Sequence, residues 1–178
     1  GASTVAMPPP MHIPVLKVEG QGLSKKQQQD LKQMEKRALE WTRANNRKYE
    51  DPDFVPGPEV LGPELAKHVD RWLRPHEFAK KPELFKNFWE IEGVKPGVLD
   101  DRWFLGAVNI VAGNKDNVDR MFLSTRKDDS ARDPMAALIE QGAQEGFYII
   151  RFYEDDPNTD DDWECILVDD RIPCDASG

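Results

Sequence analysis

The chain has 178 residues, 39% of them hydrophobic, which suits one folded domain with a real core. Its formal net charge of −9 argues against nucleic-acid binding, and no cluster of Lys and Arg stands out along the sequence. No apolar run approaches the ~20 residues of a membrane span. Two cysteines do not make a disulfide framework, so we expect an intracellular, cytoplasmic protein.

The N-terminal part of the chain predicts an arm followed by a helix. Residues 1–23 are rich in Pro and Gly and indicate an extended arm. Residues 24–48 form an amphipathic helix in this interpretation, because Ser24 and Gln27 fit a capping box. Its apolar stripe either packs on the chain's own domain or docks on a partner. The candidates for such contacts are Leu31, Met34 and Trp41, together with Ala38 on the same stripe.

The segment after this helix is dominated by turn-forming residues. Three prolines and two glycines in residues 49–62 predict an ordered loop. Aromatic anchors then alternate with turns in residues 72–75 and 82–85. His68 and His76 lie here without another ligand at metal-binding spacing, so we interpret them as ordinary surface or packing residues.

A central apolar segment begins after Pro96 and predicts a buried helix. Asp100 or Asp101 is the expected N-cap, and the side chains from Trp103 onward are apolar on nearly all sides. Gly113 and Asn114 provide the stop. Arg102 is anomalous, because the helix dipole disfavours a cation in the first turn by about 0.3–1 kcal/mol.

The rest of the chain predicts two more helices and a hairpin. Short helices are expected at residues 116–123 and 134–144, the second starting with a proline and ending before Gly146. Residues 147–153 and 163–168 are rich in β-branched and aromatic side chains, which indicates two antiparallel strands joined by an acidic tip. The fold class is α+β.

Motifs for common chemistries are weak or missing in this sequence. There is no phosphate-binding glycine loop, paired-histidine metal motif or nucleophile elbow. Asp156, Asn158 and Asp160 alternate as in a calcium loop, but the required Gly and terminal Glu are missing. Cys165 falls within a strand and Cys174 lies near the end of the sequence, so neither is expected to be a nucleophile.

Four motifs in order along the chain carry a resemblance to a known family. They are Tyr49-Glu50-Asp51-Pro52-Asp53-Phe54, Trp72-x-Arg74-Pro75, Gly97-x-Leu99-x-Asp101-x-Trp103-x-Leu105, and Trp163 with Val168-Asp169-Asp170-x-x-Pro173. Together they resemble the first half of the calpain protease core over about residues 49–173, with an apparent insertion at residues 124–140. The resemblance implies a papain-like first subdomain at residues 49–178, with helices around a buried central helix plus a small antiparallel sheet, in a longer protein.

The resemblance also implies that the catalytic machinery is gone. In calpains the nucleophilic Cys directly precedes the Trp at the start of the central helix, a position held here by Arg102, which cannot act as a nucleophile. The Gln of the oxyanion hole falls on Pro96, which offers no amide donor, and a usual Gly is Asp100. A calcium-ligand Asp falls on Gly93, with Glu92 one residue away, so no metal or other cofactor is expected.

The functional prediction is a catalytically inactive, calpain-like structural and protein-interaction module. Its expected partners are a second calpain-like half or assembly subunits, and the resemblance suggests a cytoskeletal or ciliary setting. Arg102 either bridges Asp100, Asp101 or another carboxylate, or it fills the former cleft or contacts a partner's acidic group. The alternatives are a calcium-responsive regulatory domain and a peptidase that uses Cys165 or Cys174.

Overall fold

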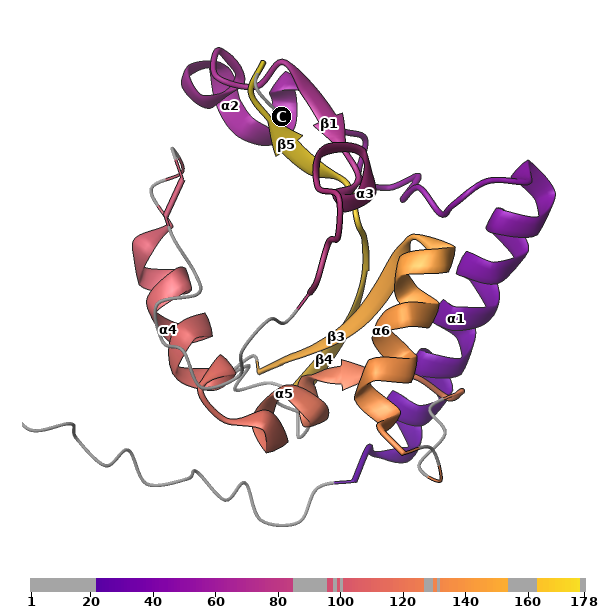
Figure 1. The fold of residues 1–178 in the computed structure, drawn as a ribbon. Coiled ribbons are helices and arrows are strands. Elements are labelled where there is room, and N and C mark those ends of the chain that lie inside the picture. The colour runs from indigo at the N-terminus through magenta and orange to yellow at the C-terminus, as the bar shows by residue number, and fades with distance from the viewer. Residues whose placement is uncertain are drawn as a thin grey trace, which may run out of the picture.

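The structure is a computed structural model that describes residues 22–84, 96–97, 99, 101–126, 130, 132–153 and 163–176. The described chain forms an open C (Figure 1), with a three-stranded sheet and two helices on one side and a pair of helices on the other. The elements are α1 (Lys25–Asn45), α2 (Pro58–Ala66), β1 (Arg71–Leu73), α3 (Pro75–Phe78), α4 (Arg102–Ala112), α5 (Lys115–Met121), β2 (Phe122–Leu123), α6 (Pro134–Glu145), β3 (Phe147–Tyr153), β4 (Trp163–Asp169) and β5 (Ile172–Cys174). The arm at residues 1–21 lies outside the described residues.

Helix α1 forms where the sequence predicts a helix, and it begins with the expected capping box. The Gln27 amide donates to the Ser24 hydroxyl at 3.1 Å, and the Ser24 amide donates to the Gln27 side chain at 3.2 Å. Left-handed Asn46 ends the helix. Its buried face lies against β3 and β4.

The apolar stripe of α1 packs on the chain's own domain, which is one of the two interpretations that its sequence allows. Leu31 is only 3% exposed, so it is not available to a partner. Trp41 is half-buried and meets the Tyr49 ring edge-on, with the ring centroids 5.5 Å apart. Met34 is also half-buried. Packing within the chain therefore accounts for most of this stripe.

The larger sheet has the strand order β2-β3-β4, and all its pairs are antiparallel. Ile149 pairs with Leu167 and Arg151 with Cys165, so the predicted hairpin of β3 and β4 is confirmed. Phe147, Ile149 and Arg151 alternate along β3 as its buried residues, while the residues between them are more exposed. The acidic tip of the hairpin, residues 154–162, lies outside the described residues.

Five short elements were not expected from the sequence, and one of them is β2, which takes the last two residues of the helix predicted at residues 116–123. Helix α2 lies in the segment predicted to be a loop, and helix α3 follows β1. Strand β1 pairs with β5, bringing Trp72 opposite Pro173. Both α2 and α3 begin with proline, which is favourable at the first helical position although it breaks a helix elsewhere. Of the three prolines in the predicted loop, Pro58 is therefore a helix start, whereas Pro52 and Pro56 lie in non-helical chain.

Helix α6 agrees with its sequence signals at both ends. The Asp133 side chain accepts from the Ala136 amide at 3.1 Å, and Pro134 is the first helical residue. Gly146 ends the helix with a φ of 83°, a left-handed conformation that suits glycine. This turn leads directly into β3.

Helix α4 forms at the predicted place, but the prediction that it is buried is wrong. None of its residues is buried, and Trp103 is 79% and Ile110 58% exposed. The described part of the chain packs α5 against it, and α4 stands across the opening of the C from the sheet (Figure 1). An apolar sequence shows that a helix prefers burial, but it does not show that the same chain supplies the cover.

Candidate functional site

The first candidate site is the N-terminus of α4, where the family resemblance places the catalytic machinery. Asp101 occupies the N-cap position, and its backbone oxygen accepts from the Leu105 amide at 2.9 Å. Its carboxylate does not cap the helix, in contrast to the expectation, and its Oδ1 is buried without a hydrogen-bond partner among the described residues. Asp100 lies outside the described residues.

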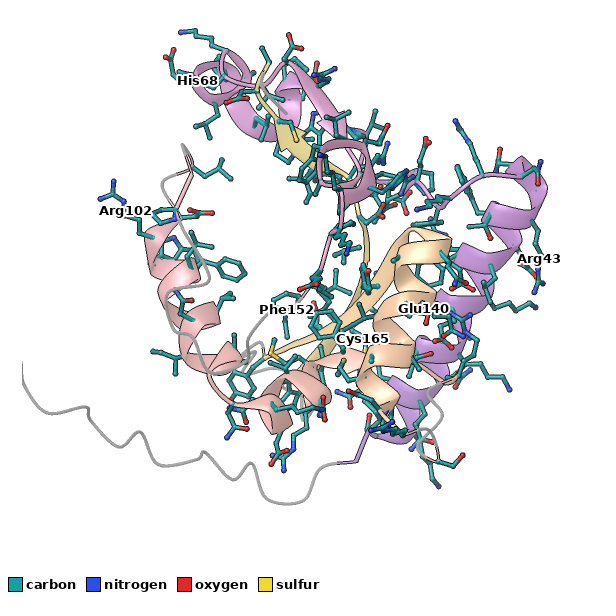
Figure 2. The ribbon with its side chains drawn as sticks, in the orientation of Figure 1. Arg43, His68, Arg102, Glu140, Phe152 and Cys165 are labelled. Atoms are coloured by element: carbon teal, nitrogen blue, oxygen red, sulfur yellow. The ribbon has the colours of Figure 1, made fainter. Side chains whose placement is uncertain are left out.

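Arg102 is the first residue of α4, and its side chain is exposed (Figure 2). The expected bridge from Arg102 to Asp101 does not form, and no ion pair joins Arg102 to any other described residue. Trp103 follows, with its ring centroid 5.8 Å from that of Phe104 in an edge-to-face arrangement. Pro96 lies in exposed coil before the helix. A cation and two aromatic residues therefore make up the first turn of this helix.

The two cysteines are on strands and not at a helix N-terminus. Cys165 is half-buried on β4, and Cys174 is buried on β5, where its thiol donates to the Ile172 carbonyl oxygen at 3.5 Å. A helix N-terminus or a neighbouring cation is what ordinarily activates a thiol. Neither strand position offers the helix end that a papain-like nucleophile uses.

A second polar centre lies where the two sheets meet, and it brings together three of the motifs that carried the resemblance. Arg74, which is 9% exposed, donates to the Asp170 carboxylate and to the Tyr49 carbonyl oxygen, the latter at 2.7 Å. The Asp170 side chain is 6% exposed. This buried ion pair joins the residue directly after β1 to the residue directly after β4, and these two residues are distant in sequence.

The neighbouring residues extend this junction. The Asp169 carboxylate accepts from the Asp51 amide at 3.0 Å and from the Arg171 Nε at 2.8 Å. Arg171 also lies 3.8 Å from the Glu50 carboxylate. Tyr49 is 1% exposed, and this burial raises the pKa of its phenol to about 12. The charged groups of the junction pair with one another and with backbone groups, so the junction holds distant segments of the fold together.

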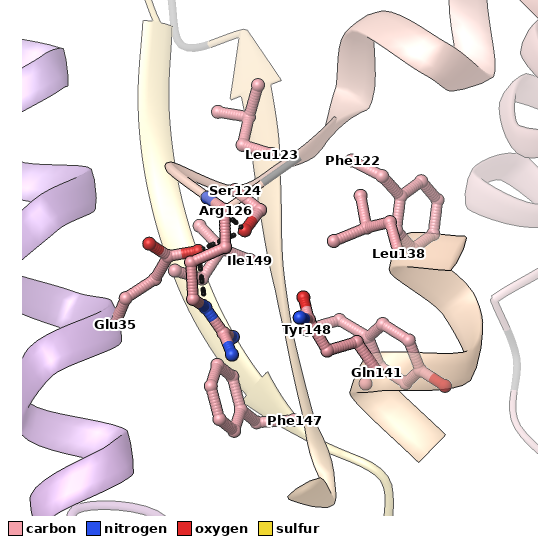
Figure 3. A pocket seen from close by; sticks show the side chains of 11 residues that line it. Glu35, Phe122, Leu123, Ser124, Arg126, Leu138, Gln141, Phe147, Tyr148 and Ile149 are labelled. Carbon is pink, nitrogen blue, oxygen red and sulfur yellow. Dashed lines mark hydrogen bonds and ion pairs between the residues drawn. The ribbon is translucent and has the colours of Figure 1, made fainter. Parts of the chain in front are cut away.

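A third polar cluster fastens α1 to the body of the domain (Figure 3), and sequence reasoning missed it. The Glu35 carboxylate, whose side chain is 4% exposed, accepts from the Ser124 hydroxyl and from the Thr125 amide and hydroxyl. Arg126 lies 3.8 Å from Glu35 and makes a two-pronged ion pair with Glu145 at 2.7 and 2.8 Å. A glutamate inside a polar helix gives no sequence signal that it is buried.

The inner wall of the C contains a hollow of about 790 Å³. Tyr148, Ile150 and Val168 line it from the sheet, and residues from α3 to Leu84 line another side. Burial raises the pKa of the Tyr148 phenol to about 12, and its hydroxyl donates to the Ile139 carbonyl oxygen at 3.4 Å. The lining is mainly apolar, which suits packing better than acid–base chemistry.

The described residues provide no candidate metal centre. No three His, Cys, Asp or Glu side chains gather among them in a way that could hold an ion. His68 and His76 are exposed, and the His76 Nδ1 lies 3.4 Å from the Lys48 ammonium group. Gly93, Glu92 and the acidic run at residues 154–162 lie outside the described residues. No described helix has the length and apolar character needed to cross a membrane.

The comparisons with known proteins agree with the arrangement of these motifs. The family model described as "Calpain family cysteine protease" matches residues 49–178. The chain is 28% identical over 144 residues to "Calpain-type cysteine protease ADL1" of Oryza sativa subsp. japonica, a match covering 74% of this chain and 6% of that protein. It is 31% identical over 104 residues to "Calpain-10" of Mus musculus, covering 58% of this chain and 13% of that protein.

The chain therefore corresponds to a small part of each of these relatives. A further match, to "Calpain-12" of Homo sapiens, is 38% identical over 66 residues, covering 33% of this chain and 9% of that protein. No solved structure matches the chain significantly. Because the family model covers well over half of the sequence, from Tyr49 to the last residue, the chain belongs to the calpain family of cysteine proteases.

Proposed function

We propose that this calpain-family domain is catalytically inactive and serves as a structural and protein-interaction module. The observation that carries the proposal is that an exposed arginine, Arg102, begins the helix at whose N-terminus the family mounts its nucleophile. A guanidinium is permanently protonated and has no lone pair for attack on a carbonyl. The chemistry that defines the family needs a thiolate at this place.

Two features of the same site support inactivity. Pro96, at the position of the oxyanion-hole Gln in the family pattern, has no N–H group to donate to a developing negative charge. Cys165 and Cys174 lie on strands, the latter with its thiol committed to a backbone carbonyl oxygen. The domain would thus retain the family's fold without its reaction.

The proposal is tested by incubating the protein with casein and with a cysteine-directed electrophilic probe. We expect no casein turnover, and we expect probe labelling that tracks thiol exposure, stronger at Cys165 than at Cys174. The matched controls are Cys165→Ser and Cys174→Ser. Casein turnover that disappears in either variant would overturn the proposal.

The exposed apolar side of α4 supports the interaction role. Trp103, Phe104 and Ile110 are 79%, 38% and 58% exposed, an arrangement that is common where another protein covers a helix. In this proposal the cover is a second calpain-like half or an assembly subunit, in a cytoplasmic setting that includes cytoskeletal or ciliary assemblies. Hydrogen exchange compares α4 in the isolated chain and in the native assembly. We expect the amides of α4 to exchange more slowly in the assembly than in the isolated chain. Equally fast exchange of these amides in both samples would exclude this role.

A further inference from the structure

The outward face of α1 carries a straight line of positive charges, the basic stripe, made of Lys25, Lys32, Lys36 and Arg43. All four side chains are exposed. Lys32, Lys36 and Arg43 lie 7, 11 and 18 residues after Lys25. At 3.6 residues per turn, each of the three therefore projects from the helix axis within about 20° of the direction of Lys25. The stripe runs for about 27 Å along the helix at 1.5 Å per residue.

The opposite face of α1 is fixed in the domain, so the stripe is presented rigidly. Leu31 and Ala38 are buried, and the Gln27 side chain donates to the Trp163 carbonyl oxygen at 2.8 Å. The Glu35 cluster holds the middle of the helix. Figure 2 shows Arg43 pointing away from the sheet, on the outside of the molecule. A partner would thus meet a preorganised row of cations, which lowers the entropy cost of binding.

These charges are mostly not neutralised within the described part of the chain. Lys25, Lys32 and Arg43 make no ion pair with a described residue, and Lys36 meets Glu40 only at 3.8 Å with both side chains more than half exposed. The neighbouring Arg37, by contrast, is paired with Asp53 at 2.5 Å. Helix α1 contains six Lys or Arg against three Asp or Glu, in a chain whose net charge is −9. The stripe is therefore a local reversal of the protein's overall charge.

We infer that the basic stripe of α1 is a docking site for an acidic polypeptide segment. An extended or helical run of Glu and Asp matches the length and single file of the four cations. A membrane surface fits less well, because the apolar face of α1 is buried and the exposed neighbours of the stripe are polar, among them Gln28 and Glu40. Nucleic acid fits less well because its charge extends beyond the stripe over the surface of a chain with a net charge of −9, whereas a short acidic segment meets the stripe alone. The inference does not depend on whether the domain is catalytically inactive.

The test measures binding of a fluorescent peptide of about ten glutamates, which spans the stripe when extended. Fluorescence anisotropy is followed with the full chain and with the variant Lys25→Glu/Lys32→Glu/Lys36→Glu/Arg43→Glu. A matched control, Lys67→Glu/Arg71→Glu/Lys80→Glu/Arg132→Glu, changes four other exposed cations by the same total charge. We expect at least tenfold weaker binding for the stripe variant, less than threefold for the control, and a steep loss of binding with added salt.

Equal losses in the two variants, or no binding by the unaltered chain, would overturn the inference. Anionic phospholipid vesicles and double-stranded DNA are measured beside the peptide. The inference would also be overturned if vesicles or DNA bound as tightly as the peptide and this binding were lost in the stripe variant. If the charge-reversed variant does not fold, as judged by circular dichroism, the variant with Gln at the same four positions replaces it. That variant is expected to weaken peptide binding at least fivefold while melting like the unaltered chain.

Discussion

Helices α1 and α4 lie on opposite sides of the molecule, and the average composition of neither helix accounts for its burial. Helix α1 is rich in Lys, Gln and Glu, yet four of its residues are buried. Helix α4 is apolar on nearly all sides, yet none of its residues is buried. Burial is therefore decided by what packs against a helix and not by the helix's average hydropathy.

The difference between the two sides comes from polar anchors as well as apolar contacts. The α1 side contains the Glu35 cluster and the Arg74–Asp170 pair, in which many buried polar groups pair with one another, although the Arg126 Nε has no hydrogen-bond partner among the described residues. Around α4, the described structure shows packing against α5 and a buried Asp101 oxygen without a hydrogen-bond partner. We therefore expect the elements on the α1 side to require a larger free energy for local opening than α4 and α5 do.

The largest expected effect comes from breaking the junction on the stable side. Arg74→Ala leaves the Asp170 carboxylate buried without its cation, and it removes the donor to the Tyr49 carbonyl oxygen. We expect a loss of about 3–5 kcal/mol in the free energy of unfolding, measured by urea denaturation. The control is Arg37→Ala, since the Arg37–Asp53 pair is exposed and such pairs contribute about 0–1 kcal/mol. Similar losses from both variants would contradict the assigned role of burial.

Removing the anchor of α1 is expected to have the next largest effect. Glu35→Ala leaves the amide and hydroxyl of Thr125 and the hydroxyl of Ser124 without their acceptor. We expect about 2–4 kcal/mol of destabilisation in urea, together with faster proteolytic cleavage within α1. Glu40→Ala removes a glutamate from the exposed face of the same helix and is expected to change stability by less than about 0.5 kcal/mol. A larger loss for Glu40→Ala than for Glu35→Ala would show that the cluster does not anchor the helix.

The buried Tyr49 provides a test by pH on the same side. Its pKa is raised to about 12, so the folded state keeps the phenol protonated where the unfolded state, with a pKa near 10, ionises. The stabilising contribution is complete below about pH 10 and is lost as the pH rises toward 12. We expect Tyr49→Phe to flatten the loss of stability between about pH 9.5 and 11.5 in urea titrations. If the free energy of unfolding of this variant falls with pH as steeply as that of the unaltered chain, the loss of stability at alkaline pH comes from other groups, such as Tyr148.

Elements with strong local signals could be predicted from the sequence alone. The capping box of Ser24 and Gln27, the left-handed stop at Gly146 and the β-branched and aromatic run of residues 147–153 all act within a few residues of themselves. The family resemblance also came from motifs, three of which converge at the Arg74 junction. These elements can be predicted because the groups that form hydrogen bonds with one another in caps and turns are close neighbours in sequence.

Other features depend on contacts between residues that are far apart in sequence, and they could not be predicted from the sequence. Glu35 is buried by residues about ninety positions away, and the three-residue strands β1 and β5 are stabilised by their mutual pairing. The cations of the basic stripe are separated by up to seven residues, so they form no cluster until α1 is seen to bury its other face. The exposure of α4 likewise depends on which surfaces are present to cover it.

The smallest expected effect on stability is on the α4 side, where Trp103 is exposed. Trp103 is 79% exposed, so Trp103→Ser removes a large apolar side chain with few intramolecular contacts. We expect a change below about 0.5 kcal/mol in the free energy of unfolding of the isolated chain. Leu31→Ala, a smaller truncation at a side chain 3% exposed on α1, is expected to cost about 2–5 kcal/mol. If Trp103→Ser destabilises the isolated chain as much as Leu31→Ala does, then α4 is packed within this chain in solution. If only Leu31→Ala destabilises it, Trp103 contributes little to the stability of the isolated domain, and its side chain is available for contacts with another protein.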